Sequence, residues 1–238
     1  MGGLLLSMSF KLYLIPNTLT DEAKGDSIAS SVAQAIKHVR LFFVEEPKSA
    51  SALLKKLNPD FPLSECTFID LNEHTLIKEA GQYLSQAQDM AIISEAGYPC
   101  VADPGADLVR LAHERGIEIV PLIGASSIIL ALASSGLGGQ NFAFNGYLPK
   151  DKDERTKKIK ALEQRSSVEK QTQIVMETPY RNQHLLEDIL SVCNPKTMLC
   201  VASDLTGPEQ MIKTASVSQW QKSGIKLEKK PTLFLMNT

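Results

Sequence analysis

The sequence lacks the motifs by which the commonest nucleotide-binding and metal-binding sites are recognised. It contains no G-x-G-x-x-G, which argues against an ordinary dinucleotide site, and no G-x-x-x-x-G-K-[ST], which argues against P-loop chemistry. Its four cysteines show no C-x-x-C spacing and its four histidines are scattered, so we expect reduced, buried thiols and no metal site. No apolar run has membrane-spanning length, and the first residues lack the basic and apolar regions of a signal peptide. These absences predict a cytoplasmic protein that does not associate with membranes.

The composition is that of a protein with a packed core. At 238 residues with 43% hydrophobic residues, the chain is long enough for one large domain or two ordinary ones. The net charge is −2 and the sequence pI is about 6.1, which argues mildly against unaided, non-specific nucleic-acid binding over a wide footprint. A local basic patch remains compatible with this balance.

Short apolar runs alternate with helical periodicity along the first half of the chain. We predict strands at residues 10–15, 41–44, 67–71, 90–93 and 117–122, and helices at residues 21–39, 50–57, 74–84 and from Asp107 to Gly116. This alternation indicates βαβ units and a mainly parallel sheet. The predicted N-terminal α/β domain therefore covers residues 1–122, and a C-terminal α/β domain covers residues 123–238.

The second half also alternates strands and helices. We predict strands at residues 173–176, 198–202 and 231–236, and helices at residues 128–133, 183–190 and 216–221. Residues 150–165 are the most basic stretch, with seven Lys or Arg against four acidic residues. Two interpretations of this stretch remain open: a solvated helix with mixed charges, or a surface that contacts RNA phosphates.

Two loops of small residues follow the strands predicted at 90–93 and 117–122. Gly97 and Pro99 break the chain after the first strand, Asp103-Pro104-Gly105 breaks it again, and Asp107 stands where a helix N-cap belongs. Gly124-Ala-Ser-Ser127 follows the second strand. Because open α/β sheets bind ligands at the carboxyl ends of their strands, these loops predict a small-ligand site.

The stretch from Ser94 to Gly105, Ser-Glu-Ala-Gly-Tyr-Pro-Cys-Val-Ala-Asp-Pro-Gly, resembles a known signature. It is similar to the Ser-Asp-Ala-Gly-Thr-Pro-x-x-x-Asp-Pro-Gly of the tetrapyrrole methylase family, the class III S-adenosylmethionine-dependent methyltransferases. Within that family the chain is nearest the 16S rRNA (cytidine-2′-O)-methyltransferase branch, as a divergent member. The resemblance spans nearly the whole chain. It implies two α/β domains with S-adenosyl-L-methionine in the cleft between them, and a homodimer.

Several flanking motifs of the family are altered here. Pro16-Asn17-Thr18 replaces a Pro-Thr-Pro-Ile-Gly-Asn loop without its glycine, and its Asn and Thr are expected to cap the next helix. Val44-Glu-Glu-Pro-Lys48 corresponds to Ala-Glu-Asp-Thr-Arg, with Lys in place of the planar Arg fork. Glu177-Thr-Pro-Tyr-Arg181 resembles Tyr-Glu-Ser-x-x-Arg, and Asp204-Leu-Thr-Gly resembles Glu-Leu-Thr-Lys. Lys229-Lys-Pro-Thr232 departs from Lys-Gly-Glu toward the Thr-Pro-Ala of the corrin and porphyrin methylases.

The resemblance and the residue types together nominate three sets of residues. The cofactor set is Pro16, Ser94, Glu95, Ala96, Gly97, Pro99, Asp103, Gly105, Gly124, Ala125, Ser126, Ser127, Glu177, Leu205, Pro231 and Thr232. The substrate set is Lys48, Lys157, Lys158 and Arg181. A ribose hydroxyl must lose a proton during methylation, so a base is expected, with Glu45, Glu95, Glu177 and Asp204 as candidates at strand ends. Surface ion pairs are the alternative explanation for these four carboxylates.

Three functional hypotheses follow. The first is ribose 2′-O-methylation of 16S ribosomal RNA, with RNA or the small ribosomal subunit as partner. The second keeps the cofactor but makes the acceptor a small molecule such as a tetrapyrrole, which the acidic pI and Pro231-Thr232 favour. The third is a non-catalytic S-adenosylmethionine-binding protein, which the altered motifs favour. Fold-level analogy does not choose among them.

Overall fold

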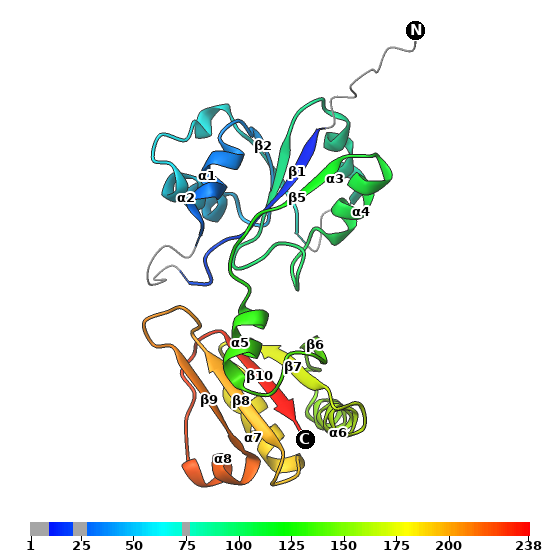
Figure 1. Ribbon diagram of the computed structural model, residues 1–238, viewed down its shortest axis with the longest axis vertical. Coiled ribbons are helices and arrows are strands. Elements are labelled where there is room, and N and C mark those ends of the chain that lie inside the picture. The colour runs from blue at the N-terminus through cyan, green and yellow to red at the C-terminus, as the bar shows by residue number, and fades with distance from the viewer. Residues whose placement is uncertain (1–9, 21–27, 73–76) are drawn as a thin grey trace. The chain divides into compact units, whose positions relative to one another are not determined.

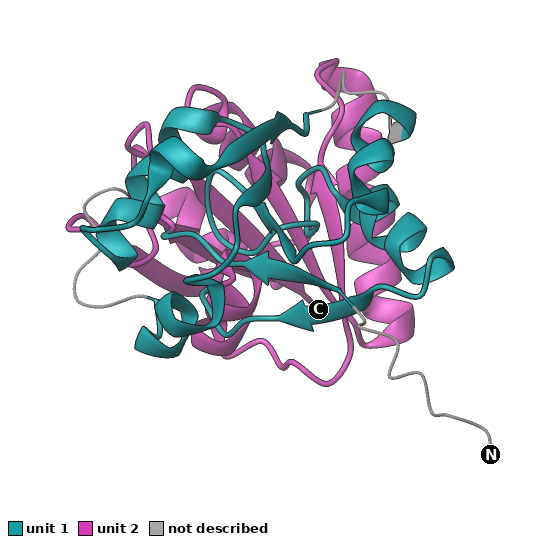
Figure 2. Ribbon diagram, turned by 90° about the horizontal axis from the view of Figure 1, so that it is seen from above, with its two compact units in different colours: residues 1–18, 25–125 teal, residues 19–24, 126–238 magenta. Residues whose placement is uncertain are grey.

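The computed structural model describes residues 10–20, 28–72 and 77–238, which form two compact units, each built around its own five-stranded sheet (Figures 1 and 2). Of the described chain, residues 10–18 and 28–125 belong to the first unit. Residues 19–20 and 126–238 belong to the second. This architecture confirms the predicted α/β class with two sheets. The domain limits derived from the sequence, 1–122 and 123–238, stay a prediction.

The sheet of the first unit is entirely parallel, where the sequence predicted a mainly parallel one. Its strands run in the order β3-β2-β4-β1-β5. Their bounds are β1 (Lys11–Ile15), β2 (Leu41–Val44), β3 (Thr67–Asp70), β4 (Met90–Ile93) and β5 (Glu118–Pro121). Every residue of β2 and β4 is buried, because helices cover both faces of the sheet. This double burial explains why the two strands read as uninterrupted apolar runs.

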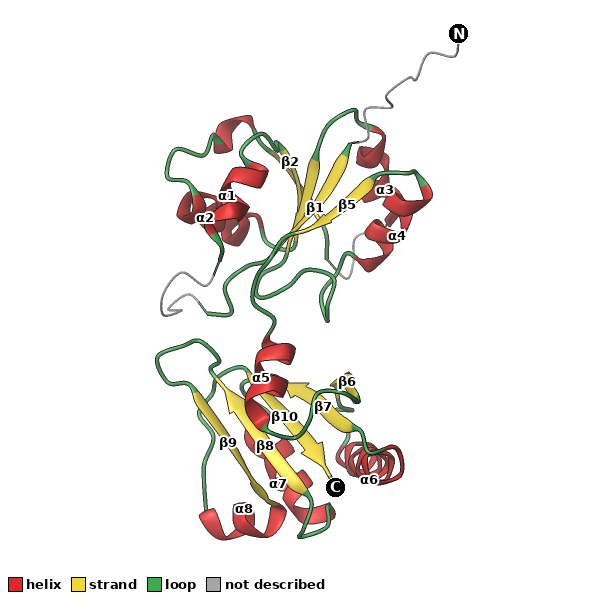
Figure 3. Ribbon diagram, viewed as in Figure 1, coloured by secondary structure: helices red, strands yellow, loops and turns green. Residues whose placement is uncertain are grey.

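Helices on opposite faces of the first sheet separate its apolar residues into two clusters. Tyr13 and Phe42 pack with α1 (Ser30–Ile36) and α2 (Pro47–Leu57) on one face. Leu12 and Phe43 pack with α3 (Ile77–Gln82) and α4 (Ala106–Glu114) on the other. Two short 3₁₀ turns, η1 (Leu63–Glu65) and η2 (Tyr83–Ser85), complete the unit. The chain leaves the neighbouring strands β1 and β4 toward opposite faces of the sheet, which is the position at which such sheets bind ligands (Figure 3).

Helix boundaries show where the sequence-based expectations were wrong. Helix α4 begins at Ala106 with Gly105 as its N-cap residue, so Asp107 lies in the first turn and pairs with Arg110. Helix α2 begins at Pro47, three residues earlier than predicted, because the Glu46 side chain caps the Lys48 N–H. Gly116 has φ 69° and follows the end of α4 as predicted. The helices predicted at 21–39 and 74–84 lie partly outside the described residues.

The sheet of the second unit is mixed and has the order β6-β7-β10-β8-β9. Its strands are β6 (Phe142–Tyr147), β7 (Thr172–Glu177), β8 (Met198–Ser203), β9 (Met211–Ser216) and β10 (Thr232–Asn237). Strands β6 and β7 are parallel and the other three pairings are antiparallel. The edge strand β9 was not predicted. Because β6, β7 and β8 run in one direction and β10 runs in the opposite one, the carboxyl ends of the first three and the amino end of β10 lie at the same edge of the sheet.

Helices also cover both faces of the second sheet. Helix α5 (Ser127–Ser135) packs on one face, and α6 (Lys152–Glu169), α7 (Asn182–Val192) and α8 (Val217–Ser223) pack on the other (Figure 3). The fully buried Trp220 anchors α8, since its indole N–H donates to the Leu199 carbonyl at 2.8 Å. Gly136, in the left-handed conformation, ends α5 as predicted. Since the helices cover the two faces, the chain forms loops at the edge shared by β6, β7, β8 and β10.

Candidate functional site

In the first unit, the loop after β1 is bonded to the loop after β4. The buried Asn17 side chain donates to the carbonyls of Ser94 and Glu95, at 3.0 and 2.9 Å. Its backbone N–H donates to the Gly97 carbonyl at 2.8 Å, and the Gly97 N–H donates to the Thr18 carbonyl. Asn17 therefore joins two loops. The N-cap residue of α1 is instead Ala29, without a side-chain cap, so the prediction that Asn17 caps this helix was wrong.

Three glycines of the predicted cofactor set lie at positions that disfavour a side chain, through backbone conformation or lack of room. Gly97 and Gly105 have φ values of 71° and 125°, which L-residues rarely adopt. A Cβ on Gly105 would also lie 2.7 Å from the Cys100 sulfur. A Cβ on Gly124 would lie 2.1 Å from Cγ of Pro16, so the loops after β1 and β5 touch there. Pro16 and the loops holding Ser94–Gly97 and Gly124 thus converge at the carboxyl edge of this sheet.

The segment between β4 and α4 carries backbone strain. Cys100 and Ala102 have φ values of 67° and 64° although neither is glycine. Such conformations cost of order 1 kcal/mol or more each and cluster at ligand-binding loops. The tight turn also buries the thiol, and burial together with nearby Asp103 raises the pKa of Cys100 to about 11. Cys100 is accordingly a neutral, unreactive thiol at physiological pH.

Three carboxylates gather beside this strained turn. Glu45 follows β2, Glu95 follows β4, and Asp103 lies in the turn itself. Burial, followed by repulsion from Glu45 and Glu95, raises the pKa of Asp103 to about 7. Asp103 therefore exchanges its proton near neutral pH, which is the property of a general acid or base.

In the second unit, Glu177 and Arg181 form an ion pair at the shared sheet edge. Glu177 ends β7 with its side chain 1% exposed, and its Oε2 lies 2.9 Å from Nη2 of Arg181. The other oxygen, Oε1, accepts the Thr178 N–H at 2.8 Å. Arg181 also donates to the Pro149 carbonyl at 3.4 Å. These bonds hold the loop after β7 against the loop after β6.

A second polar network lies at the start of β10. The hydroxyl of Thr232 donates to Oγ of Ser203 at 2.9 Å, and the Asn182 amide donates to Thr232 and to the Lys230 carbonyl. Asn182 is 1% exposed, and its Oδ1 has no hydrogen-bond partner among the described residues. Nothing in the sequence pattern singled out Asn182 or Ser203, because their contacts depend on strands that are not consecutive in the chain.

Asp204 is engaged in its own turn. Its backbone φ is 50°, its Oδ2 accepts the Glu209 N–H at 2.9 Å, and its N–H donates to the Pro231 carbonyl. A Cβ on Gly207 would lie 2.3 Å from the Asp204 carboxylate, so the turn closes tightly over it. The buried Leu205 belongs to the core cluster that contains α5.

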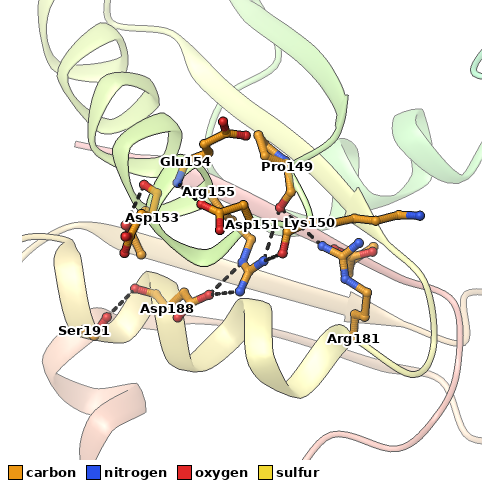
Figure 4. A network of polar contacts seen from close by, with 11 residues as sticks. Pro149, Lys150, Asp151, Asp153, Glu154, Arg155, Arg181, Asp188 and Ser191 are labelled. Atoms are coloured by element: carbon orange, nitrogen blue, oxygen red, sulfur yellow. Dashed lines mark hydrogen bonds and ion pairs between the residues drawn. The ribbon is translucent and has the colours of Figure 1, made fainter.

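The basic candidates are spread over separate surfaces. Lys48 is exposed on α2 in the first unit, and Lys157 and Lys158 are exposed on α6 in the second. Arg155, from the same basic stretch, instead points inward to Asp188 at 2.6 Å and donates to the carbonyls of Pro149 and Lys150 (Figure 4). The stretch is therefore a surface helix with one buried cation.

The remaining predicted residues lie at the edges of the two units. Ala96 is exposed beside Glu95, and Pro99 is buried in the turn that follows. Ala125 ends the first unit, and Ser126 occupies the N-cap position of α5 without a side-chain cap bond, followed by Ser127. Among the described residues there is no group of three or more potential ligands suited to a metal ion. Over the same residues, no helix is long and apolar enough to cross a bilayer.

Comparison with known proteins identifies the family. The sequence model of the Tetrapyrrole (Corrin/Porphyrin) Methylases matches residues 24–220 of this chain. The chain belongs to the tetrapyrrole methylase family. It is therefore a methyltransferase. The match also confirms that the loop from Ser94 to Gly105 resembles the signature of this family.

Sequence relatives within the tetrapyrrole methylase family carry a more specific name. Ribosomal RNA small subunit methyltransferase I of Escherichia coli O157:H7 is 31% identical over 209 residues, which cover 88% of this chain and 70% of that protein. The protein of the same name from Pseudomonas aeruginosa is 29% identical over 197 residues, covering 82% of this chain and 67% of that one. This chain thus aligns with about two thirds of those relatives.

Solved structures confirm the fold of the family. The methyltransferase CobJ superposes with a TM-score of 0.62 at 16% identity, over 97% of this chain and 94% of that chain. Uroporphyrin-III C-methyl transferase from Thermus thermophilus, complexed with S-adenyl homocysteine, superposes with a TM-score of 0.53 at 10% identity, over 95% and 97% of the two chains. At these identities the likeness concerns the architecture alone.

Proposed function

We propose that this chain is an S-adenosylmethionine-dependent methyltransferase that methylates a ribose 2′-oxygen of 16S ribosomal RNA in the cytoplasm. The observation that carries the proposal is the 31% identity over 88% of the chain to a ribosomal RNA small subunit methyltransferase I. The structural neighbours named as porphyrin methylases are only 10–14% identical. The loops joined by Asn17 supply the geometry, since they lie at the carboxyl edge of a parallel sheet.

Each unit has, at the edge of its own sheet, features that suit a cofactor with an adenosine and an amino-acid tail. In the first unit, the strained turn and the left-handed glycines Gly97 and Gly105 bring backbone close to the edge. In the second unit, the buried Oδ1 of Asn182 and Oγ1 of Thr206 lack partners among the described residues, which suits polar groups supplied by a ligand. We assign cofactor contacts to the predicted set and add Asn17 and Asn182 as residues that position it.

When bound, S-adenosylmethionine supplies an electrophilic methyl group for an in-line displacement. The chain's own contribution is to hold donor and acceptor aligned, and the loops joined by Asn17 provide a preorganised surface for this. Exposed Lys157 and Lys158 on α6 provide positive charge for RNA phosphates.

The four candidate bases have different neighbours. Glu177 pairs with Arg181, and Asp204 accepts a backbone N–H of its own turn, so both are engaged in structural bonds. Glu45 and Glu95 flank Asp103, whose pKa of about 7 suits proton transfer at neutral pH. We therefore place the base among Glu45, Glu95 and Asp103, with Asp103 as the proton acceptor.

Calorimetric titration with S-adenosylmethionine and S-adenosylhomocysteine, followed by a labelled-methyl assay on small ribosomal subunits from a methylase-deficient strain, tests the proposal. We expect tight binding and label in 16S RNA, and loss of cofactor affinity in folded Gly97→Val and Gly124→Val variants. Retained affinity in either variant would remove its loop from the site. Cofactor binding without label in RNA would refute the RNA substrate in favour of a small-molecule acceptor or a non-catalytic binding protein.

We further propose that the active form is a homodimer. Ile129 and Leu130 are 53% and 39% exposed on α5, although the opposite side of that helix is packed in the core. Exposed apolar side chains side by side are typical of protein interfaces. Sedimentation velocity should give a dimer for the wild type and a monomer for Ile129→Glu. A monomeric wild type at micromolar concentration would contradict the proposal.

A further inference from the structure

Two tyrosines are exposed at the carboxyl edge of β6 and β7. Tyr147 ends β6 and is 55% exposed, and Tyr180 lies in the loop after β7 and is 77% exposed. Their strands are parallel neighbours, with Tyr147 in register with Met176. The Arg181 side chain also donates to the Pro149 carbonyl, so the loop after β7, which carries Tyr180, contacts the loop that follows Tyr147 (Figure 4). Both tyrosines therefore lie at the same edge of the second sheet.

The backbone that carries Tyr180 is held firmly. The Arg181 N–H donates to the Thr178 carbonyl at 2.9 Å and closes a tight turn around Tyr180. The ion pair between Nη2 of Arg181 and Oε2 of the buried Glu177, 2.9 Å apart, also holds this turn in place. Since helix α7 begins directly afterwards at Asn182, the turn has rigid elements on both sides. An exposed ring on a rigid turn loses little conformational entropy when a ligand stacks on it.

A cation contacts the ring of Tyr180. The Lys229 ammonium lies 5.4 Å from the centroid of the Tyr180 ring, in a cation–π contact. Lys150 is exposed in the loop after β6, and Glu228 is the exposed acid next to Lys229 in the chain. The buried acid at the end of β7, Glu177, is paired with Arg181. The Lys229 ammonium thus lies against a tyrosine that is 77% exposed.

We propose that Tyr180, in contact with Lys229, is a stacking platform for an unpaired base of the RNA substrate. This rests on the proposed function and adds to it the class of RNA structure recognised, a single-stranded segment next to the target nucleotide. Sequence-specific RNA enzymes bind unstacked bases on aromatic side chains, and cations beside the ring meet the flanking phosphates. Tyr180 acts here as a positioning residue, since no reacting atom needs to touch it.

The test compares Tyr180→Ala with Tyr180→Phe, which keeps the aromatic face. We expect the Ala variant to bind a fluorescein-labelled single-stranded oligoribonucleotide about 10- to 100-fold more weakly and to raise KM for small ribosomal subunits. The Phe variant should bind within about twofold of the wild type, because the ring supplies the stacking. Lys229→Gln should reduce the salt dependence of binding, with Lys222→Gln on α8 as the matched control.

The readouts separate failure of this inference from failure of the proposed function. Titration with S-adenosylhomocysteine checks that each variant is folded, since Tyr180 is outside the assigned cofactor set. If the wild type labels 16S RNA and the Ala variant matches its KM and RNA affinity, the stacking platform is refuted while the function stands. If the wild type binds cofactor but labels no 16S RNA, the function is refuted and the platform with it. Equal loss in the Phe and Ala variants would also overturn stacking, because it would assign the effect to the hydroxyl.

Discussion

Replacing Asp103 with Asn should stabilise the protein at high pH and hardly at all at low pH. Burial and the charges of Glu45 and Glu95 raise the pKa of Asp103 in the folded state to about 7, against an ordinary value near 4. The folded state therefore favours the neutral carboxyl. Stability conferred by that preference is fully present below about pH 4 and is lost as the pH rises to about 7.

The size of the effect follows from the shift in pKa. A shift of about three units corresponds to about 4 kcal/mol at 1.36 kcal/mol per unit, which is an upper bound because Asp103 is partly exposed and screened by water. We expect Asp103→Asn to raise the free energy of unfolding by about 1–3 kcal/mol at pH 8 and by less than about 1 kcal/mol at pH 4.5. Glu45→Gln should lower the pKa of Asp103 by removing one repulsive charge.

Urea denaturation between pH 4.5 and 8.5, followed by circular dichroism, measures the effect. The single tryptophan, Trp220, lies in the second unit, so its fluorescence reports a different part of the molecule from Asp103. Asp107→Asn is the matched control, because it makes the same change to an exposed carboxylate at the start of α4, away from Glu45 and Glu95 in the sequence. A gain in the free energy of unfolding that is the same at every pH would refute the reasoning. An NMR titration that gives the Asp103 carboxyl a pKa near 4 would also refute it.

Three further predictions concern other contacts. Asp188→Ala should destabilise the protein by about 3–5 kcal/mol in urea denaturation, because it leaves Arg155 buried without its partner; a loss under about 1 kcal/mol would contradict this. Asn17→Ala should lower the free energy of unfolding by about 1–3 kcal/mol, because two loop carbonyls lose their hydrogen-bond donor. It should also weaken S-adenosylhomocysteine binding in calorimetry, and an unchanged affinity would show that Asn17 does not act on the cofactor site. Lys157→Glu with Lys158→Glu should weaken RNA binding and flatten its salt dependence, whereas an unchanged slope would make α6 a solvated face.

The core strands of the first unit could be predicted from sequence because their burial is local and complete. Strands β2 and β4 begin and end where the apolar runs do, since both faces are covered. Strand β9 was missed because it is an edge strand in which Lys213 and Thr214 interrupt the apolar pattern. Its position depends on pairing with β8, which no pattern within β9 itself encodes.

Helix ends were predictable only where a backbone requirement selects the residue type. Gly116 and Gly136 ended helices as expected, because both adopt the left-handed conformation that glycine tolerates. The starts of α2 and α4 were misplaced, because several polar residues in each segment are compatible with an N-cap. The fold selects one of them, Glu46 in α2, and uses Gly105 without any side-chain cap in α4.

The sequence by itself determined the family, the alternation of strands and helices, and the loop from Ser94 to Gly105, because these depend on residue types close together in the chain. Only the tertiary structure decided which groups act on one another. Asn17 meets Ser94 across 77 positions, and the pKa of Asp103 depends on Glu45, which follows a different strand. Hydrogen bonding and repulsion act over a few ångströms of space rather than along the chain, so these properties arise only when the strands are placed side by side.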